Sequence, residues 1–289
     1  MTIEIKKVAV LGCGLMGSGI AEVCARAGFD TAVMEVTADL LERGLGRIRA
    51  SLDKGVQKGG VSREDADSAL GRIRGTTDPG DLKDVDLFIE AVIENIGEKE
   101  KLYQVLSKVA SPDAIFASNT SSLSITELAA TTDRPDRFIG LHFFNPAPRM
   151  KLVETVRTLA TLPEVIEAGE AFIRKLGKEP IRAPDGPGFI VNRLLIPFLL
   201  DAIRMVEAKV AEPEAIDKAM TLGAGHPMGP LALLDFVGLD TSLYIADIFY
   251  GELREARFAP PPLLKRMVAL GYLGRKSGRG FFDYSARSR

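Results

Sequence analysis

The sequence has few residues of several chemically informative kinds: it contains no tryptophan, two histidines and two cysteines. Cys13 lies in a glycine-rich turn and Cys24 lies well along the helix expected after it, so the two thiols are too far apart for a disulfide. Unpaired cysteines are typical of a reducing compartment, which predicts a cytoplasmic protein. We predict no metal site.

The sequence also lacks a basic block and a long apolar run. Its formal net charge is −2, so charge predicts neither a nucleic-acid partner nor an anionic membrane surface. The most apolar helix expected, residues 194–206, is too short to span a bilayer and contains Pro197, Asp201 and Arg204. The first strand begins almost at once, which leaves no room for a signal or transit sequence. We therefore expect no membrane partner.

A strand, a glycine turn and a helix open the chain. The apolar segment 8–11 leads into Gly12, Gly14 and Gly17, and the following helix ends at Gly28. In this pattern the first glycine permits the turn, the second lets the backbone approach a pyrophosphate, and the third lets the helix pack on the strand. Free N–H groups at the helix start favour a phosphate. The predicted dinucleotide-binding residues of this turn are Gly12, Gly14, Leu15, Met16 and Gly17.

The second apolar run, residues 31–34, ends in Glu35, which lies 18 residues after Gly17. At this spacing a carboxylate accepts hydrogen bonds from the adenosine ribose, and it repels a 2′-phosphate. No arginine or lysine follows until Arg43. These features favour NAD over NADP as the cofactor. The alternative interpretation is that Glu35 ends a strand in solvent.

A long helix is expected over residues 38–58. Lys54 and Lys58 are four residues apart on it and so share one face. Spacing alone is typical of a solvated helix surface. The alternative is that the two lysines bind the anionic tail of a substrate.

Two further strands, 86–90 and 114–118, each end in polar residues. Asn95 and Lys99 follow the first strand, at the edge of a parallel sheet where ligands bind, although Lys99 could equally be a surface lysine. The second strand opens into residues 119–122, which carry only small hydroxyl and amide groups. Ser124 and Glu127 form a capping box for the next helix. This capping box does not require Ser121 and Ser122, so the presence of these two serines needs another explanation, such as a ligand.

The strand over 137–141 runs into His142, and a second apolar strand, 150–156, carries Glu154 at its centre. A buried glutamate is costly without a partner, and His142 is available across the proline-rich turn. A carboxylate that holds one imidazole nitrogen leaves the other free to take a proton. A lone histidine beside an apolar strand is otherwise most often a core residue. His226, in a turn with Pro227 and Pro230, is interpreted as structural.

The alternation of strands and helices continues through a helix over 163–176 and a short edge strand over 179–182, and then stops near Asp185. We predict an α/β Rossmann-like domain with a mostly parallel sheet over residues 1–185 and an all-α domain over residues 186–289. The helices expected in the second domain span 189–210, 213–221, 230–249 and 262–270. A basic, glycine-rich loop with an aromatic, strand-like end follows over 273–284.

Eight motifs, in one order over nearly the whole chain, resemble the short-chain 3-hydroxyacyl-CoA dehydrogenase family, particularly its bacterial 3-hydroxybutyryl-CoA dehydrogenase members. Each motif is weak alone, and the set is specific. The motifs are GCGLMGSG at 12–19, EAVIEN at 90–95, ASNTSSLSIT at 117–126, GLHFFNPAP at 140–148, MKLVE at 150–154, PGFIVNRLL at 187–195, HPMGPL at 226–231 and GRKSGRGFFDY at 274–284.

The resemblance implies an NAD-dependent oxidoreductase of fatty acid metabolism that interconverts (S)-3-hydroxyacyl-CoA and 3-oxoacyl-CoA. It implies an active site in the cleft between the two domains and a homodimer formed by the helical domain. His142 is then the catalytic base and Glu154 its orienting partner, while Ser121 and Asn192 contact the substrate and Lys54 and Lys58 the CoA. The remaining cofactor contacts implied are Glu94, Asn95, Lys99, Ser121, Asn145 and Lys276.

Two departures from the family pattern bear on these expectations. Many members have Arg-Asp where this chain has Met34 and Glu35, and Arg149 stands where many members have a hydrophobic residue. Glutamate still accepts ribose hydroxyls, so NAD remains the expected cofactor, and Arg149 predicts a more polar cleft wall. Two other functions stay open: a β-hydroxyacid dehydrogenase for free acids, which typically uses a lysine base, and a non-catalytic NADH-binding protein.

Overall fold

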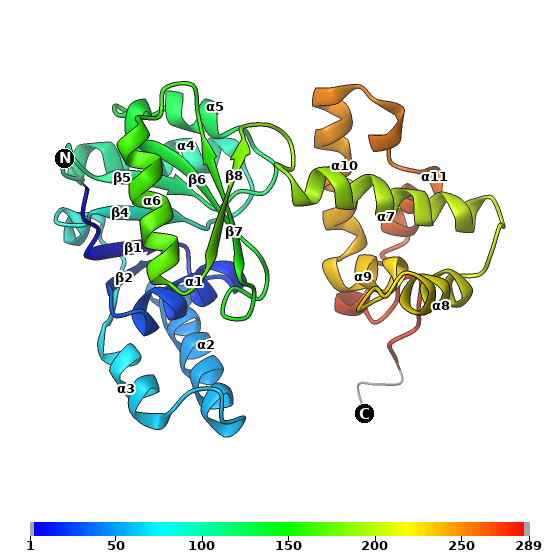
Figure 1. Ribbon diagram of the computed structural model, residues 1–289, viewed down its shortest axis with the longest axis horizontal. Helices are drawn as coiled ribbons and strands as arrows, with labels where there is room; N and C mark the ends of the chain where they lie inside the picture. The colour runs from blue at the N-terminus through cyan, green and yellow to red at the C-terminus, as the bar shows by residue number, and fades with distance from the viewer. Residues whose placement is uncertain (1–2, 286–289) are drawn as a thin grey trace. The chain divides into compact units, whose positions relative to one another are not determined.

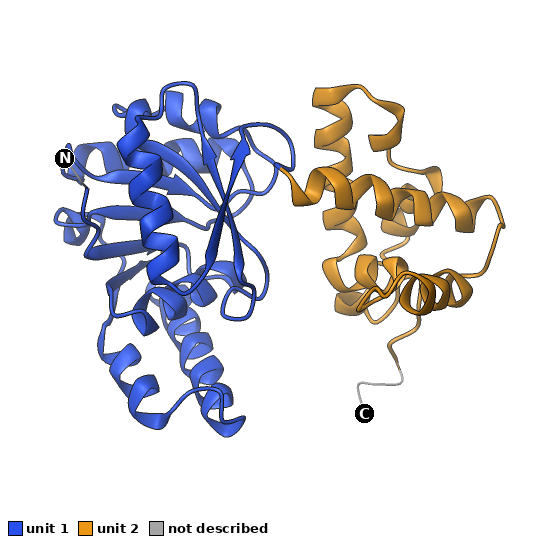
Figure 2. Ribbon diagram, in the orientation of Figure 1, with its two compact units in different colours: residues 1–189 blue, residues 190–289 orange. Residues whose placement is uncertain are grey.

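A computed structural model of the protein describes residues 3–285. The chain divides into two compact units, residues 1–189 and residues 190–289, which Figure 2 shows in different colours. Within the described residues no helix is long and apolar enough to cross a membrane.

Unit 1 is built on one eight-stranded sheet with the strand order β3-β2-β1-β4-β5-β6-β7-β8. The first six strands pair in parallel, β7 is antiparallel to β6, and β8 is parallel to β7. This confirms the predicted mostly parallel Rossmann-like sheet, with β8 as an edge strand. The strands are β1 Lys7–Leu11, β2 Asp30–Met34, β3 Ile73–Thr76, β4 Leu87–Glu90, β5 Ile115–Ser118, β6 Phe138–Phe143, β7 Leu152–Arg157 and β8 Glu179–Pro184.

Helices cover both faces of this sheet because each helix has one apolar side to bury. One core cluster joins the sheet to α1, α2, α3 and α6, and the other joins it to α4 and α5. Figure 1 shows α6 and α1 in front of the strands and α4 and α5 behind them. The helices are α1 Leu15–Arg26, α2 Ala38–Gln57, α3 Arg63–Gly71, α4 Ile96–Val109, α5 Ile125–Ala130 and α6 Pro163–Lys175, with the short 3-10 helices η1 Pro79–Leu82 and η2 Pro135–Arg137.

Unit 2 is helical, as predicted, around a core of its own. The prediction of one helix over 230–249 is wrong, because two helices, α9 and α10, meet at Gly238. This residue has φ = +105°, a left-handed conformation that glycine adopts without a Cβ clash and that interrupts the helix. The elements are α7 Val191–Glu207, α8 Pro213–Gly223, α9 Pro230–Val237, α10 Leu239–Leu253, η3 Ala256–Phe258, α11 Pro262–Ala269 and η4 Arg275–Ser277.

The end of the described chain folds back on unit 2 without forming the expected strand. Only isolated bridges occur there, from Gly274 to Arg279 and from Arg279 to Asp283. Buried Asp235 of α9 accepts hydrogen bonds from the backbone N–H groups of Phe281 and Phe282 instead. A side-chain acceptor thus replaces the partner strand that this aromatic segment would have needed.

Cys13 and Cys24 are both free and buried. Burial, with a smaller contribution from Glu35, raises the pKa of the Cys13 thiol to about 11. Burial raises the pKa of the Cys24 thiol to about 12. Neither thiol is therefore a thiolate at neutral pH, and both act as small core residues.

Candidate active site

The glycine turn lies between β1 and α1, at the carboxyl end of β1. Gly12 has φ = +86°, and its N–H donates to the Met34 carbonyl oxygen at 2.8 Å. A Cβ atom on Gly17 would lie 1.9 Å from the Gly12 carbonyl oxygen, so no side chain fits there. A Cβ atom on Gly14 would meet nothing within 4 Å. The turn is therefore closed toward the protein at Gly17 and open to a ligand at Gly14.

The residues around this turn fit a dinucleotide. No side chain caps the start of α1, so its first N–H groups remain for a phosphate. Half-buried Glu35 does not end its strand in solvent, because its Oε1 accepts a hydrogen bond from the Cys13 N–H at 2.6 Å. A carboxylate has acceptor sites beyond this one, which suits it to ribose hydroxyls. Leu15 is 70% exposed at the same edge and Met16 is half-buried.

His142 and Glu154 form the central polar pair of unit 1. They are direct cross-strand partners in the antiparallel pair of β6 and β7, which brings their side chains together on one face. The His142 Nδ1 atom lies 2.7 Å from Glu154 Oε2, and the side chains are 7% and 0% exposed. The contact predicted between these two residues is present. Because Nδ1 is engaged, Nε2 is the nitrogen that remains for proton exchange with a substrate.

Aromatic rings surround the His142 imidazole. The ring centroid of Phe144 lies 4.4 Å away and that of Phe189 lies 5.6 Å away. Such packing restricts the rotamers of the imidazole and lowers the local dielectric constant, which strengthens the contact with Glu154. The pair is thus held in one orientation before any substrate binds.

A second buried polar cluster lies where β4 and β5 end. Lys99 is 1% exposed, so the interpretation of Lys99 as a surface lysine is wrong. Its Nζ lies 2.6 Å from Glu90 Oε1 and 3.1 Å from Glu94 Oε2. Ser118 Oγ donates to the other Glu90 oxygen at 2.6 Å, and the Val92 N–H donates to Oε1 at 2.8 Å. The cluster ties the β4–α4 segment to the end of β5.

Glu94 holds the segment after β5 in this cluster. The hydroxyl groups of Thr120 and Ser122 donate to Glu94 Oε1, and the Ser121 N–H reaches the same oxygen at 3.3 Å. Burial acts to raise the pKa of Glu94, but Lys99 and these hydroxyl donors outweigh it, and the pKa is lowered. Glu94 is therefore ionised at neutral pH. Its hydrogen bond with the Ser122 hydroxyl accounts for a serine at that position. The hydroxyl of half-buried Ser121 remains for another partner.

The other predicted site residues of unit 1 lie on its surface. Asn95 is exposed and caps α4 by accepting the Glu98 N–H at 3.1 Å. Asn145 is exposed in the segment after β6, and Lys54 and Lys58 are exposed at the end of α2. Exposure fits both interpretations of the two lysines.

Three residues considered from the sequence belong to unit 2. Asn192 is half-buried in the first turn of α7. The Lys276 Nζ lies 2.6 Å from Asp240 Oδ1, so this lysine is held by an ion pair at the start of α10. The His226 ring lies 5.4 Å from the Phe198 ring, as suits a structural residue.

Glu90 and Ser118 are the polar residues that sequence reasoning missed. Each is the last residue of an apolar strand, and both are fully buried. The available signal was Glu90 itself, an acid at the end of an apolar strand, because a buried carboxylate requires a polar partner.

Family models match both halves of the chain. The NAD binding domain of 3-hydroxyacyl-CoA dehydrogenase matches residues 7–186, and the C-terminal domain of the same enzyme matches residues 188–284. The chain belongs to the 3-hydroxyacyl-CoA dehydrogenase family. It is an enzyme, an NAD-dependent oxidoreductase with NAD as its cofactor.

Relatives of known name span the full length. The 3-hydroxybutyryl-CoA dehydrogenase of Mycobacterium tuberculosis is 50% identical over 286 residues, which are 98% of this chain and 100% of the relative. The probable 3-hydroxybutyryl-CoA dehydrogenase of Bacillus subtilis is 45% identical, with 99% of each chain covered. The crystal structure of (S)-3-hydroxybutyryl-CoA dehydrogenase from Ralstonia eutropha has a TM-score of 0.94 at 44% identity, covering 98% of this chain and 100% of that chain.

Proposed function

We propose that this member of the 3-hydroxyacyl-CoA dehydrogenase family interconverts (S)-3-hydroxyacyl-CoA and 3-oxoacyl-CoA thioesters, with 3-hydroxybutyryl-CoA and acetoacetyl-CoA as the substrate pair. The observation that carries the proposal is the buried contact of His142 with Glu154 near the carboxyl end of β6. The names of the relatives from M. tuberculosis and R. eutropha support the choice of a four-carbon thioester.

His142 is the general base of the oxidation in this mechanism. Its Nε2 takes the proton of the substrate 3-hydroxyl group as a hydride leaves C3 of the same substrate. In the reduction, the imidazolium returns this proton to the 3-oxo oxygen. Bound NAD supplies hydride acceptance and bound NADH supplies hydride donation. Glu154 fixes the tautomer at Nδ1 and stabilises the imidazolium that forms.

The remaining roles belong to the same proposal and rest on the motifs that this chain shares with the family. Ser121 and Asn192 donate hydrogen bonds to substrate oxygens, which orients the reacting carbon. Lys54 and Lys58 bind the CoA portion. The cofactor is held by Gly12, Gly14, Leu15, Met16, Gly17, Glu35, Glu94, Asn95, Lys99, Ser121, Asn145 and Lys276, of which Lys99 acts through the ion pairs that set the position of Glu94.

The test is a spectrophotometric assay with acetoacetyl-CoA and NADH. We expect loss of NADH absorbance that depends on the thioester, with free acetoacetate as the matched control substrate giving little turnover. Turnover of the free acid but not the thioester would identify a β-hydroxyacid dehydrogenase instead. NADH binding with no turnover of either substrate would identify a non-catalytic protein.

We also propose that the enzyme is a homodimer that unit 2 assembles. Apolar side chains remain exposed on its helices and directly after them, among them Leu194 at 72%, Leu222 at 76% and Leu270 at 68%. Exposed apolar surface of this kind is typical of subunit interfaces. Light scattering of the purified enzyme should give twice the mass of 31.2 kDa, and a monomer mass would refute the assembly.

A further inference from the structure

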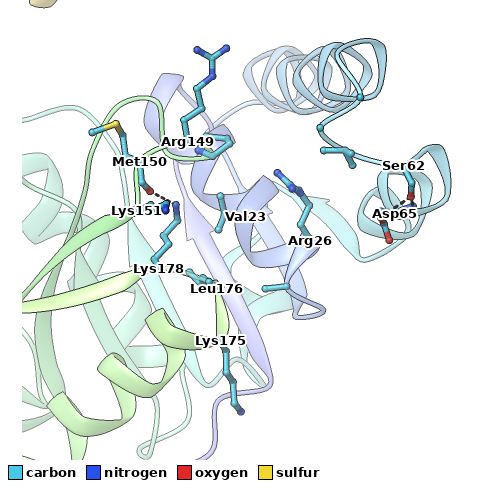
Figure 3. Close-up of a pocket in the computed structure, with 16 residues that line it drawn as sticks. Val23, Arg26, Ser62, Asp65, Arg149, Met150, Lys151, Lys175, Leu176 and Lys178 are labelled. Atoms are coloured by element: carbon cyan, nitrogen blue, oxygen red, sulfur yellow. Dashed lines mark hydrogen bonds between the residues drawn. The ribbon is translucent and has the colours of Figure 1, made fainter. Parts of the chain in front are cut away.

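Unit 1 contains a pocket of about 670 Å³ that none of the predicted site residues lines. Four segments enclose it: the end of α1, residues 59–65 between the end of α2 and the start of α3, residues 148–151 before β7, and residues 175–178 from the end of α6 toward β8. Figure 3 shows these segments meeting around the pocket. The volume is within the usual range of small-molecule sites, about 300–1,000 Å³.

The lining of this pocket is strongly basic. Five cationic side chains contribute to it. Among the lining residues the one carboxylate is that of Asp65, which is engaged with the Ser62 hydroxyl at 2.7 Å, and buried Glu22 behind the lining lies 3.6 Å from Arg26. Over residues 3–285, no acidic side chain comes within 4.0 Å of Arg149, Lys151 or Lys175, whose charges therefore remain uncompensated by the protein. The five cations are Arg26, Arg149, Lys151, Lys175 and Lys178.

Lys178 distinguishes the pocket from a group of surface lysines, because this lysine is buried and held by hydrogen bonds. The residue is 8% exposed, and its Nζ donates to the carbonyl oxygens of Ala147 and Met150 at 2.6 Å each. An ammonium group carries three donors, so one N–H remains for a ligand. Burial, and then the charge of Arg26, lower the pKa of Lys178. An anion in the pocket would relieve this repulsion.

Favourable interactions with helix dipoles explain the positions of only some of these cations. Arg26 and Lys175 stand in the last turns of α1 and α6, where cations are ordinarily favoured. Lys151 and Arg149 lie on a connecting segment, and Lys178 is buried beyond the end of α6. In Figure 3 Arg26 extends into the space between the segment of Met150 and that of Ser62, and its guanidinium also lies 3.6 Å from Glu22 Oε1 on the same helix.

We propose that this pocket binds a phosphorylated small molecule that carries at least two phosphate groups. Clustered arginine and lysine donors recognise phosphate oxygens through charge-assisted hydrogen bonds. Two sources share this chemistry: the phosphate end of a CoA thioester, which rests on the proposed function, and a free phosphorylated metabolite. The short distance in sequence from Lys58 to pocket residues Gly59 and Gly60 is compatible with the first source.

The test uses the full-length enzyme and two double variants. Lys151→Glu with Lys175→Glu reverses two exposed charges of the pocket, one directly before β7 and one in the last turn of α6. Arg157→Glu with Lys108→Glu is the matched control, because these exposed residues end β7 and stand in the last turn of α4. Both variants change the net charge equally, so general repulsion of anions affects both.

Calorimetric titration with inorganic pyrophosphate, at saturating NADH so that the cofactor edge is occupied, measures the site directly. We expect the parent and the control variant to bind pyrophosphate with one Kd. The pocket variant should bind about tenfold more weakly or worse, as expected when charged hydrogen bonds are lost. Absence of binding to the parent, or equal binding to both variants, would overturn the proposal.

Kinetics then separate the two sources. If the CoA thioester is the ligand, the pocket variant raises KM for acetoacetyl-CoA and leaves KM for acetoacetyl-pantetheine, which lacks the nucleotide phosphates, unchanged. If a free metabolite is the ligand, both KM values stay at the parent value while pyrophosphate binding is lost. Failure of the parent to reduce either thioester would refute the proposed function alone, since pyrophosphate binding is measured without turnover.

Discussion

Glu90 and Glu154 are two fully buried carboxylates of one sheet that are used in different ways. Glu90 accepts hydrogen bonds from Lys99, Ser118 and the Val92 backbone, so both of its oxygens are occupied. Glu154 contacts an imidazole through one oxygen at 2.7 Å. Lysine keeps its charge at neutral pH, whereas histidine exchanges its proton in that range.

This difference separates a structural cluster from the pair that we propose to be reactive. The cluster of Glu90, in which both carboxylate oxygens accept hydrogen bonds, fixes the backbone of the β4–α4 and β5–α5 segments. Glu154 contacts only the Nδ1 side of His142, so in the mechanism that we propose Nε2 exchanges a proton with the substrate while the ring keeps its orientation. Burial by itself therefore does not distinguish the catalytic pair that we propose from a structural cluster; the imidazole partner of Glu154 does.

The largest effect that would sharpen this comparison is expected for His142→Ala. Removal of a positioned general base should lower kcat roughly 10²–10⁴-fold, while NADH binding stays normal. Stopped-flow or steady-state assays with acetoacetyl-CoA measure the first quantity and fluorescence titration the second. His226→Ala, at the other histidine of the chain, is the control and should retain activity. Near-normal turnover of His142→Ala would remove the base assignment.

Lys99→Met should lower the free energy of unfolding. The substitution leaves Glu90 buried without its cation, and breaking a buried ion pair from one side costs about 3–5 kcal/mol. Denaturant unfolding measures the loss, and exposed Lys101→Met on the same helix is the matched control. A loss below about 1 kcal/mol, the value of a surface pair, would show that the cluster does not support the fold.

Glu154→Gln keeps the size of the side chain and removes its charge. A hydrogen bond to a charged group contributes about 1.5–3 kcal/mol, so kcat should fall roughly tenfold to a hundredfold. The free energy of unfolding should change less than in Lys99→Met, because His142 can remain neutral. If Glu154→Gln lost more stability than activity, the two carboxylates would have the same structural use and the comparison would fail.

The smallest effect is expected in the pH dependence of stability. Because the native pKa of Glu94 is lowered from its ordinary value of 4.5, Glu94 contributes stability that is present above that value and is lost as pH falls through the lower native value. Glu94→Gln should therefore flatten the decline of unfolding free energy on the acid side of pH 4.5. Urea unfolding at several pH values measures it, and an unchanged slope would contradict the ionised state assigned to Glu94.

Local patterns predicted much of unit 1. The order of strands, the glycine turn and Glu35 depend on short-range rules of turn geometry and spacing, and the structure has them in place. The partner of Glu154 followed from the cost of a buried charge. The position of Lys99 did not follow, because its burial depends on Glu90, nine residues away, and on how β4 and α4 pack. The break at Gly238 was missed for a similar reason, since both sides of it are apolar and helical.

The amino-acid sequence by itself determined the Rossmann-like fold, the helical second half, the family and the use of NAD, because each rests on periodicity, glycine placement or motif order. Apart from the contact of His142 with Glu154, tertiary structure alone decided which polar groups meet. It joined Glu90 to Ser118 across 28 residues and gathered five cations from three segments around one pocket. Hydrogen bonds and ion pairs require distances near 3 Å, and only the folded chain brings residues so far apart in sequence within that range.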